Sequence, residues 1–209
     1  MAGHAQDAKG NVYRFESDWI HELESEITWR RYWHQQKLLN GVLKPGASIL
    51  ELGPGTGFTA QYLRSRGFTV TTLDIDPDKK PDIVANLADY EFPKRYDCII
   101  AFEIMEHVPF DVVRSMLPRA AAACDAFVFS VPQMVRTWLD VSVKVPRFRE
   151  LSLRLSTPRR GNLTPNHHWE LGPHSVPERK LRELLEASGL KVERTSTFKH
   201  WTFYITRPR

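Results

Sequence analysis

Three glycines at alternate positions follow a short apolar run within residues 48–58, and an acidic residue stands just before them. The stretch reads SILELGPGTGF, and its defined positions are Glu51, Gly53, Gly55 and Gly57. A phosphate-binding P-loop would continue with Gly-Lys-Ser/Thr, whereas here the last glycine is followed by Phe58. The dinucleotide fingerprint G-x-G-x-x-G fails too, because Phe58 stands where its third glycine belongs. A carboxylate beside the loop would repel a pyrophosphate, so the pattern favours a ligand with a cationic group.

A second acidic residue lies at the spacing of a nucleoside site. The run FTVTTLDID is rich in β-branched residues, which favour a strand, and that strand is predicted to end at Asp74. A carboxylate roughly 20 residues after the first glycine is the usual acceptor for ribose hydroxyl groups in a βαβ nucleotide site. Alone, Asp74 would be equally typical of a turn in the polar run DIDPDKK. In register with the glycine motif, it is predicted to bind ribose.

Four segments together resemble the class I S-adenosylmethionine-dependent methyltransferases. ELGPGTG matches the family's acidic-x-Gly-x-Gly-x-Gly motif at every defined position, and RYDCIIAFEIMEHVP is similar to its fourth strand and the Glu-x-x-Glu-His-Val run that follows. FVFSVP is similar to the fifth strand, and HHWELGPHSVPERKLRELLEASGL to the segment through the last helix of small-molecule members. The resemblance covers Ser48 to the C-terminus.

The resemblance implies an enzyme with S-adenosylmethionine as its cofactor. The positions that it assigns to the cofactor are Glu51, Gly53, Pro54, Gly55, Gly57, Asp74, Ile75, Asn86, Leu87 and Glu103. Many members have Asp after the third strand, where this chain has Asn86. An Asn could still accept a hydrogen bond from the adenine amino group through its carbonyl oxygen, and Asp89 is the competing candidate for that contact.

Alternating strand and helix patterns predict an α/β fold, in which helices cover both faces of a parallel sheet. As the resemblance also implies, we expect a Rossmann-like, doubly wound, mostly parallel sheet with an antiparallel C-terminal hairpin strand, plus an N-terminal helix. A single domain over 1–209 is expected, with a flexible lead-in at 1–16, a helical lid at 17–40 and an acceptor-side insertion at 134–174. Strands are predicted near 48–52, 69–74, 83–86, 97–102 and 126–131.

Helix signals stand at both ends of the chain. The N-terminal helix carries Ile20, Leu23 and Ile27 at helical spacing and a Glu26/Arg30 pair. Its aromatic residues, Trp29, Tyr32 and Trp33, suit either a lid over the site or, as the safer expectation, core packing. In the last helix, Ser175 and Glu178 have capping-box spacing, Pro177 suits the first turn, and the residues expected to be buried before Gly189 are Leu181, Leu184 and Leu185.

Basic residues concentrate in the segment after the fifth strand. Seven of them, against two acidic residues, lie between Met134 and Asn162, while the whole chain has a net charge of only +4. This segment would bind an anionic acceptor, or it would be a solvated amphipathic helix with Phe148, Leu151 and Leu155 of FRELSLRLS on one face. Nucleic acid is possible but not favoured, because no reader motif accompanies the charge.

Methyl transfer from a sulfonium needs positioning more than acid–base groups, because the leaving group is already activated. A base is required only for a weakly acidic hydroxyl or a protonated amine, and the candidates are His107, His167 and His168. His107 would equally suit packing against the following helix. The predicted function is therefore methyl transfer to an O or N atom of a small anionic or aromatic metabolite. RNA or protein acceptors, and a non-catalytic S-adenosylmethionine-binding module, stay as alternatives.

Other sequence features set limits on location and chemistry. No apolar run approaches the ~18 to 20 residues of a membrane helix, and MAGHAQDAKGN is too polar for a signal peptide, so a cytoplasmic protein without a membrane partner is expected. Cys98 and Cys124 have neither disulfide nor metal spacing, and no metal site is predicted. The oligomeric state is not predicted.

Overall fold

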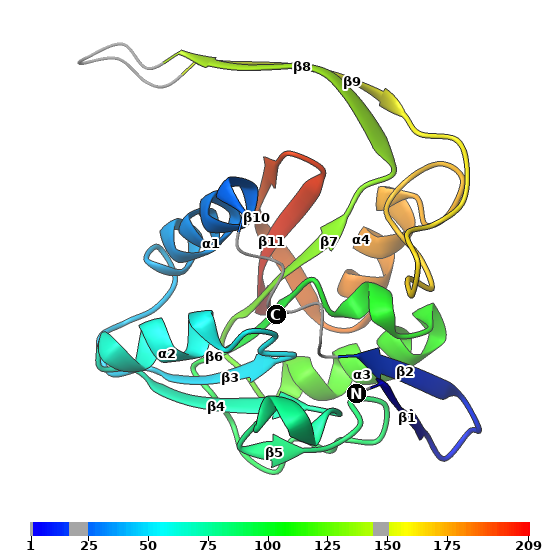
Figure 1. Cartoon of the computed structure of the whole chain (residues 1–209). Coiled ribbons are helices and arrows are strands. Elements are labelled where there is room, and N and C mark those ends of the chain that lie inside the picture. The colour runs from blue at the N-terminus through cyan, green and yellow to red at the C-terminus, as the bar shows by residue number, and fades with distance from the viewer. Residues whose placement is uncertain (1, 17–24, 144–150) are drawn as a thin grey trace.

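A seven-stranded sheet forms the centre of the protein (Figure 1). The structure, a computed structural model, describes residues 2–16, 25–143 and 151–209. The sheet order is β10-β11-β7-β6-β3-β4-β5. Its parallel strands are β3 (Ser48–Leu52), β4 (Thr69–Asp74), β5 (Ile83–Val84), β6 (Cys98–Phe102) and β7 (Phe127–Pro132). The hairpin of β10 (Leu190–Phe198) and β11 (Trp201–Pro208) continues the sheet antiparallel to β7, so the predicted fold class is confirmed.

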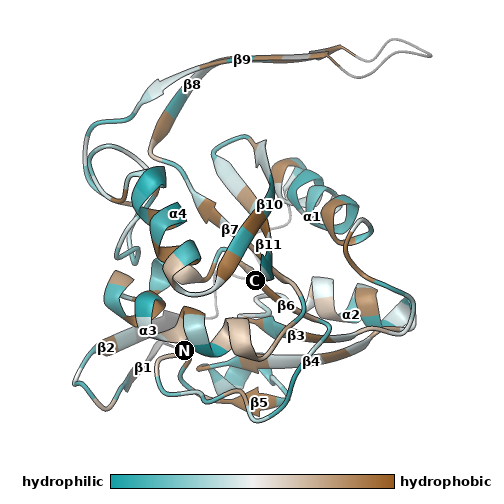
Figure 2. Cartoon of the chain, turned by 180° about the vertical axis from the view of Figure 1, so that it is seen from behind, coloured by the Kyte–Doolittle hydropathy of each residue, from teal (hydrophilic) through white to brown (hydrophobic). Residues whose placement is uncertain are grey.

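Helices cover both faces of this sheet. α1 (Glu26–Leu39) and α2 (Phe58–Ser65) pack on one face, and α3 (Phe110–Ala122) and α4 (Glu178–Ala187) pack on the other. Two short 3₁₀ helices, η2 (Pro77–Lys79) and η3 (Met105–His107), follow β4 and β6. The central strands β6 and β7 are nearly continuous apolar runs because side chains on both of their faces are buried, and Figure 2 shows the apolar colour along the middle of the sheet.

The first residues of the chain form a hairpin, so the expected flexible lead-in at 1–16 is wrong for the part that the structure describes. β1 (Ala2–Gln6) pairs antiparallel with β2 (Val12–Glu16). Asp7 closes the turn, because its Oδ1 accepts hydrogen bonds from the backbone N–H groups of Lys9 and Asn11 at 2.9 and 2.8 Å. Tyr13 donates its hydroxyl to Asp7 Oδ2 at 2.8 Å and packs into the core, which anchors the hairpin.

Within the described residues, the N-terminal helix predicted over 17–40 runs from Glu26 to Leu39. Residues 17–24, with Ile20 and Leu23, lie outside the described residues, and α1 begins at Glu26 with Ser25 as its N-cap. Trp29 and Trp33 are 47% and 63% exposed, so core packing was the wrong expectation for these two side chains. Packing on the sheet instead uses Leu38 and Leu39.

The basic segment forms a two-stranded antiparallel ribbon of β8 (Val135–Val143) and β9 (Leu151–Pro158), which projects from the body of the protein (Figure 1). The amphipathic-helix interpretation of FRELSLRLS is therefore wrong for its described part, and residues 144–150 lie outside the described residues. The sequence from Leu151 alternates Leu-Ser-Leu-Arg-Leu, which is the period of a strand.

The start of the last helix also differs from expectation. Pro177 is the N-cap of α4 and makes no side-chain capping bond. Ser175 instead accepts a hydrogen bond from the backbone N–H of Glu170 at 3.2 Å, so the predicted capping box is wrong. The buried face holds, with Leu181 and Leu185 fully buried and Leu184 partly so.

Two further features bear on the expectations from sequence. Cys98 and Cys124 are both buried and free. Across the described ranges, no helix combines the length and the apolar character needed to cross a membrane.

Candidate active site

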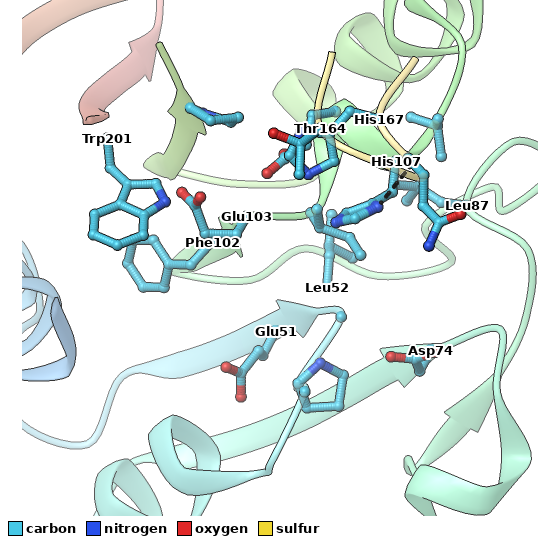
Figure 3. Close-up of a pocket in the computed structure, with 18 of the residues that line it drawn as sticks. Glu51, Leu52, Asp74, Leu87, Phe102, Glu103, His107, Thr164, His167 and Trp201 are labelled. Atoms are coloured by element: carbon cyan, nitrogen blue, oxygen red, sulfur yellow. Dashed lines mark hydrogen bonds between the residues drawn. The ribbon is translucent and has the colours of Figure 1, made fainter. Parts of the chain in front are cut away.

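A pocket of about 1230 Å³ opens where β3, β4, β6 and β7 end. This is the edge at which open α/β sheets bind their ligands, since the loops leaving the carboxyl ends of the strands diverge there. Glu51 and Asp74 reach it from the ends of β3 and β4 (Figure 3). Glu103, His107 and His167 lie across the pocket from them (Figure 3). We call the side with Glu51 and Asp74 the strand-end wall and the other side the facing wall.

The glycine loop has the backbone that the motif demands. Gly53 and Gly55 have φ of 65° and 55°, in the left-handed region that favours glycine. A Cβ added at Gly53 would lie 2.5 Å from Ile104 Cδ1, whereas one at Gly55 would meet no protein atom within 4 Å. Gly55 lines the pocket, so the space beside it is available to a ligand.

Glu51 is a buried carboxyl group without a partner for one oxygen. Glu51 is 4% exposed, and its Oε2 makes no hydrogen bond with any part of the chain that the structure describes. Burial raises the pKa of Glu51 to about 8. Such a group gains most from a ligand that brings a positive charge or a hydrogen-bond donor, because either one stabilises the ionised form.

Asp74 is buried at the end of β4 and already engaged. Its Oδ1 accepts the backbone N–H of Asp76 at 2.9 Å, and Lys79 Nζ lies 3.1 Å from Oδ2. Lys79 also lines the pocket. A ribose bound at Asp74 would therefore share this carboxylate with Lys79.

Asn86 lines the pocket, whereas its competitor Asp89 does not. Asn86 Oδ1 accepts the backbone N–H of Ala88 at 3.0 Å, and its buried Nδ2 has no hydrogen-bond partner. The atom of Asn86 that is left for a ligand is thus the hydrogen-bond donor Nδ2. The contact expected from the sequence is instead the carbonyl oxygen, as an acceptor.

Of the other residues predicted to bind the cofactor, some line the pocket and one does not. Pro54, Ile75 and Leu87 line the pocket. Gly57 does not, because it serves as the N-cap of α2 with φ of 75°.

Glu103 follows β6 directly and stands on the facing wall. Its φ of 55° is unusual for a residue with a side chain and is a strain that functional sites tend to keep. Its Oε1 accepts a hydrogen bond from Ser130 Oγ at 2.5 Å, and burial raises the pKa of Glu103 to about 7. Trp201, at the start of β11, lies beside this carboxyl group (Figure 3).

Of the three predicted histidines, the structure brings two together. The rings of His107 and His167 have centroids 4.8 Å apart and line the pocket. Burial disfavours the charged form of His107, and the neighbouring His167 adds to this effect. Together they lower the pKa of His107 to about 4, so His107 is neutral at physiological pH. His168 is exposed and does not line the pocket, and its backbone N–H donates to Glu106 O at 2.8 Å.

Several further residues that line the pocket were not predicted as site residues, although Tyr32 belongs to the aromatic group for which a lid was one interpretation. They come from the N-terminal hairpin, α1, η3, the loop before α4 and the C-terminal hairpin with its turn, and they are Tyr13, Arg31, Tyr32, Gln35, Glu106, Glu170, His200 and Trp201. Tyr32 bonds Thr56 of the glycine loop at 3.0 Å through their hydroxyl groups, so α1 reaches the pocket. The guanidinium carbon of Arg31 lies 4.8 Å from the centre of the Trp201 ring.

The basic segment contributes less to the pocket than its charge indicated. Arg159 lines the pocket, with Nη2 3.2 Å from Glu170 Oε2, whereas Arg160 does not. Arg136 lies against the Trp138 ring of the ribbon at 4.6 Å. Lys144, Arg147 and Arg149 fall outside the described residues.

Known structures share this fold at low sequence identity. A S-adenosylmethionine-dependent methyltransferase from Clostridium acetobutylicum is 9% identical with a TM-score of 0.57, covering 91% of this chain and 95% of that one. The glycopeptide N-methyltransferase MtfA in complex with S-adenosylmethionine is 12% identical with a TM-score of 0.58, covering 85% and 94%. Magnesium protoporphyrin IX methyltransferase from Synechocystis PCC 6803 is 14% identical with a TM-score of 0.56, covering 93% and 86%.

Comparison with curated protein sequences gave no match. Residues 27–195, most of the chain, match the family model described as a methyltransferase domain. That range runs from α1 through the glycine loop, Glu103, His107 and His167 to β10. The chain therefore belongs to this methyltransferase family.

Proposed function

We propose that this methyltransferase transfers a methyl group from S-adenosylmethionine to an oxygen or nitrogen atom of a small acceptor with an aromatic or anionic part. The observation that carries the proposal is one pocket with two unlike walls. Glu51 of the acidic-glycine motif and Asp74 lie on one side, and Glu103, His107 and His167 lie opposite (Figure 3).

The strand-end wall suits a cationic nucleoside. Gly55 leaves space for close approach of a ligand to the backbone, and Asp74 offers a carboxylate for ribose hydroxyls. Glu51 has an orphaned buried oxygen that would gain from the ammonium group or the sulfonium of S-adenosylmethionine. The methyltransferases MtfA and magnesium protoporphyrin IX methyltransferase, which share the fold, were both crystallised with S-adenosylmethionine.

The facing wall suits an acceptor that offers a hydroxyl or amine. Phe102, Tyr32 and Trp201 supply aromatic surface for a flat acceptor. Arg31 is where a carboxylate or phosphate on the acceptor would bind, because it lies over Trp201 in the pocket. Since the leaving group of the donor is already activated, the wall mainly has to align the acceptor and exclude water.

A base would be needed if the acceptor hydroxyl is weakly acidic. His107 and His167 lie in the pocket and stay candidates, and the geometry favours them over His168. Glu103 is a further carboxyl group on the same wall, with its pKa raised to about 7 by burial.

Calorimetry with S-adenosylmethionine and its demethylated product tests the donor half of the proposal. We expect binding of both in the micromolar range, and no detectable heat from either at millimolar concentration would end the assignment. Mass spectrometry of metabolite extracts incubated with enzyme and donor then tests the acceptor half, with a new product heavier by one methylene unit as the expected result.

The ribbon of β8 and β9 gives one observation in favour of a macromolecular acceptor. It exposes a row of apolar side chains next to basic residues, with Leu151 at 71% and Trp138 at 63%, and exposed apolar patches rimmed by polar residues often mark sites of macromolecular interaction. An RNA acceptor would make activity fall steeply with added salt, as phosphate contacts do. A salt-insensitive rate on a small metabolite would exclude that alternative.

A further inference from the structure

Three side chains on the facing wall converge in a way that the transfer of a methyl group does not itself require. Glu106, His107 and His167 each offer one potential ligand atom, and these atoms all lie within 4.8 Å of one another. Glu106 and His107 belong to η3, and His167 comes from the loop before α4. All three line the pocket.

Glu106 is the strongest sign that this cluster binds something. It is 1% exposed, and neither of its carboxylate oxygens has a hydrogen-bond partner among the residues that the structure describes. Burying a carboxyl group without hydrogen-bond partners destabilises the protein, and it does so more strongly when the group is ionised. Such a group in a functional pocket calls for a ligand that neutralises it.

The two imidazole rings are held in the manner of metal ligands. His107 Nδ1 lies 3.2 Å from the carbonyl oxygen of Asn166, and His167 Nδ1 lies 2.9 Å from Glu170 Oε1. With Nδ1–H donating to an oxygen acceptor, each ring keeps its free lone pair on Nε2. A carboxylate or carbonyl acceptor behind each ring is the arrangement that fixes the tautomer and orientation of metal-bound histidines.

The backbone that carries these side chains is pinned together. Trp169 Nε1 donates to the carbonyl oxygens of Met105 and Val108 at 3.1 and 3.2 Å, and His168 N donates to Glu106 O at 2.8 Å. The loop with His167 is thereby fixed against η3. A rigid backbone suits a site of this kind, because only the side chains then have to move when an ion binds.

We propose that Glu106, His107 and His167 form a binding site for a divalent first-row transition-metal ion. Two imidazoles and one carboxylate suit Zn²⁺, Co²⁺ and Mn²⁺ and leave coordination positions open. Ligands about 2.1 Å from an ion lie roughly 3.3 Å from each other, so the side chains would close inward by about 1 Å on binding.

The role of the ion rests on the proposed function, but the site itself does not. Because the three residues line the facing wall, an open coordination position would be available to an oxygen of the acceptor. A bound divalent ion holds such an oxygen in place and lowers its pKa. The ion would thus help to deprotonate the acceptor when His107 and His167 bind the ion and cannot act as bases.

The test uses tag-free protein stripped of metal with a chelator. Titration with Co²⁺ reports the ligands through its visible absorption bands, and calorimetry with Zn²⁺ gives stoichiometry. We expect one equivalent to bind, with affinity reduced at least tenfold in Glu106→Gln and in His167→Ala. His168→Ala is the matched control, since its ring lies outside the pocket and only its backbone bonds Glu106; it should bind like the unchanged protein.

Binding of S-adenosylmethionine is measured on every variant. Donor binding reports that the pocket is folded. It also separates the metal site from the proposed function, because the protein can bind metal without binding the donor, and can bind the donor without binding metal. No cobalt bands and no heat with the unchanged protein would overturn the metal site. Equal weakening by His168→Ala would also overturn it, since the ion would then be bound elsewhere. If Glu106→Gln lowers stability too far to titrate, His167→Ala and the unchanged protein still decide.

Discussion

The two walls of the pocket are built from the chain in different ways. The strand-end wall comes from one local unit, in which β3, the glycine loop, α2 and β4 follow each other between Ser48 and Asp74. The facing wall is assembled from η3, α1, the loop before α4 and the start of β11. In the facing wall, His107 and Asn166 meet across 59 residues, and Arg31 lies against Trp201.

This difference has a functional meaning. A local unit can keep its geometry while the rest of the chain varies, which suits a wall that binds a donor common to many enzymes. A wall assembled from distant segments can change in any one of them, which suits the recognition of a particular acceptor. We therefore expect substitutions on the strand-end wall to act on donor binding and those on the facing wall to act on the acceptor.

The largest effect is expected for Gly55→Val. A Cβ there would meet no protein atom within 4 Å, so a branched side chain would extend into the pocket space that we assign to the donor. We expect S-adenosylmethionine affinity to fall roughly 100-fold or more, about 3 kcal/mol, in calorimetry.

Gly46→Val is the matched control for backbone strain. Gly46 has φ of 75° and also has no atom near an added Cβ, but it lies in the turn before β3 and not in the pocket. Gly46→Val should lower the melting temperature, because valine is strained at this φ. It should leave donor affinity within about twofold, because the ligand uses the space at Gly55 and not the space at Gly46. Equal loss of affinity in both variants would mean that strain, not blocked space, explains Gly55→Val.

Asp74→Ala should have the next largest effect. Removing the carboxylate leaves ribose hydroxyls without their acceptor, at a cost of roughly 1–3 kcal/mol in donor binding. Asp78→Ala, in the adjacent η2 and exposed, serves as the control and should change affinity little. If the two variants bind the donor alike, Asp74 serves only its contacts with Asp76 and Lys79.

Glu51 should give the protein a pH-dependent stability. Its folded pKa of about 8 lies above the ordinary value of 4.5, so the folded state holds a proton that the unfolded state has released between these two values. The contribution of Glu51 is therefore complete below about pH 4.5, declines by up to about 1.4 kcal/mol per pH unit as pH rises, and levels off above about 8. Urea unfolding at pH 6, 7 and 8 measures this slope.

Glu51→Gln is the comparison for that slope, because a neutral amide cannot titrate. The substituted protein should lose less stability between pH 6 and 8 than the unchanged protein, and it should bind S-adenosylmethionine more weakly at pH 8. Parallel slopes in both proteins would show that Glu51 titrates as an ordinary exposed glutamate and is not the group that receives the donor's charge.

The same contrast explains what could be predicted from the sequence. The strands of the central sheet, and the place of Glu51, Gly55 and Asp74 beside the pocket, were predictable because strand periodicity and the acidic-glycine motif are local. The pairing of His107 with His167, and the place of Glu106 beside them, depend on the fold of the loop before α4 over η3, which no spacing in the sequence reports. The hairpin at the N-terminus was missed because its anchor is the contact between Tyr13 and Asp7 together with core packing.

The smallest effect is expected where the facing wall meets the basic segment. Arg159 lines the pocket and Arg160, its neighbour in sequence, is exposed outside it. An anionic acceptor should therefore lose affinity in Arg159→Gln, seen as a rise of roughly three- to tenfold in its apparent Michaelis constant, with donor affinity within about twofold. The size is modest because Arg159 is partly exposed and already paired with Glu170, so solvent and that carboxylate screen its charge.

Arg160→Gln removes the same charge from the same segment and should leave the constant unchanged. An equal rise in both variants would indicate a diffuse field of the basic segment, and no rise in either would move the recognition of an anionic group to Arg31, which lies against Trp201 on the same wall.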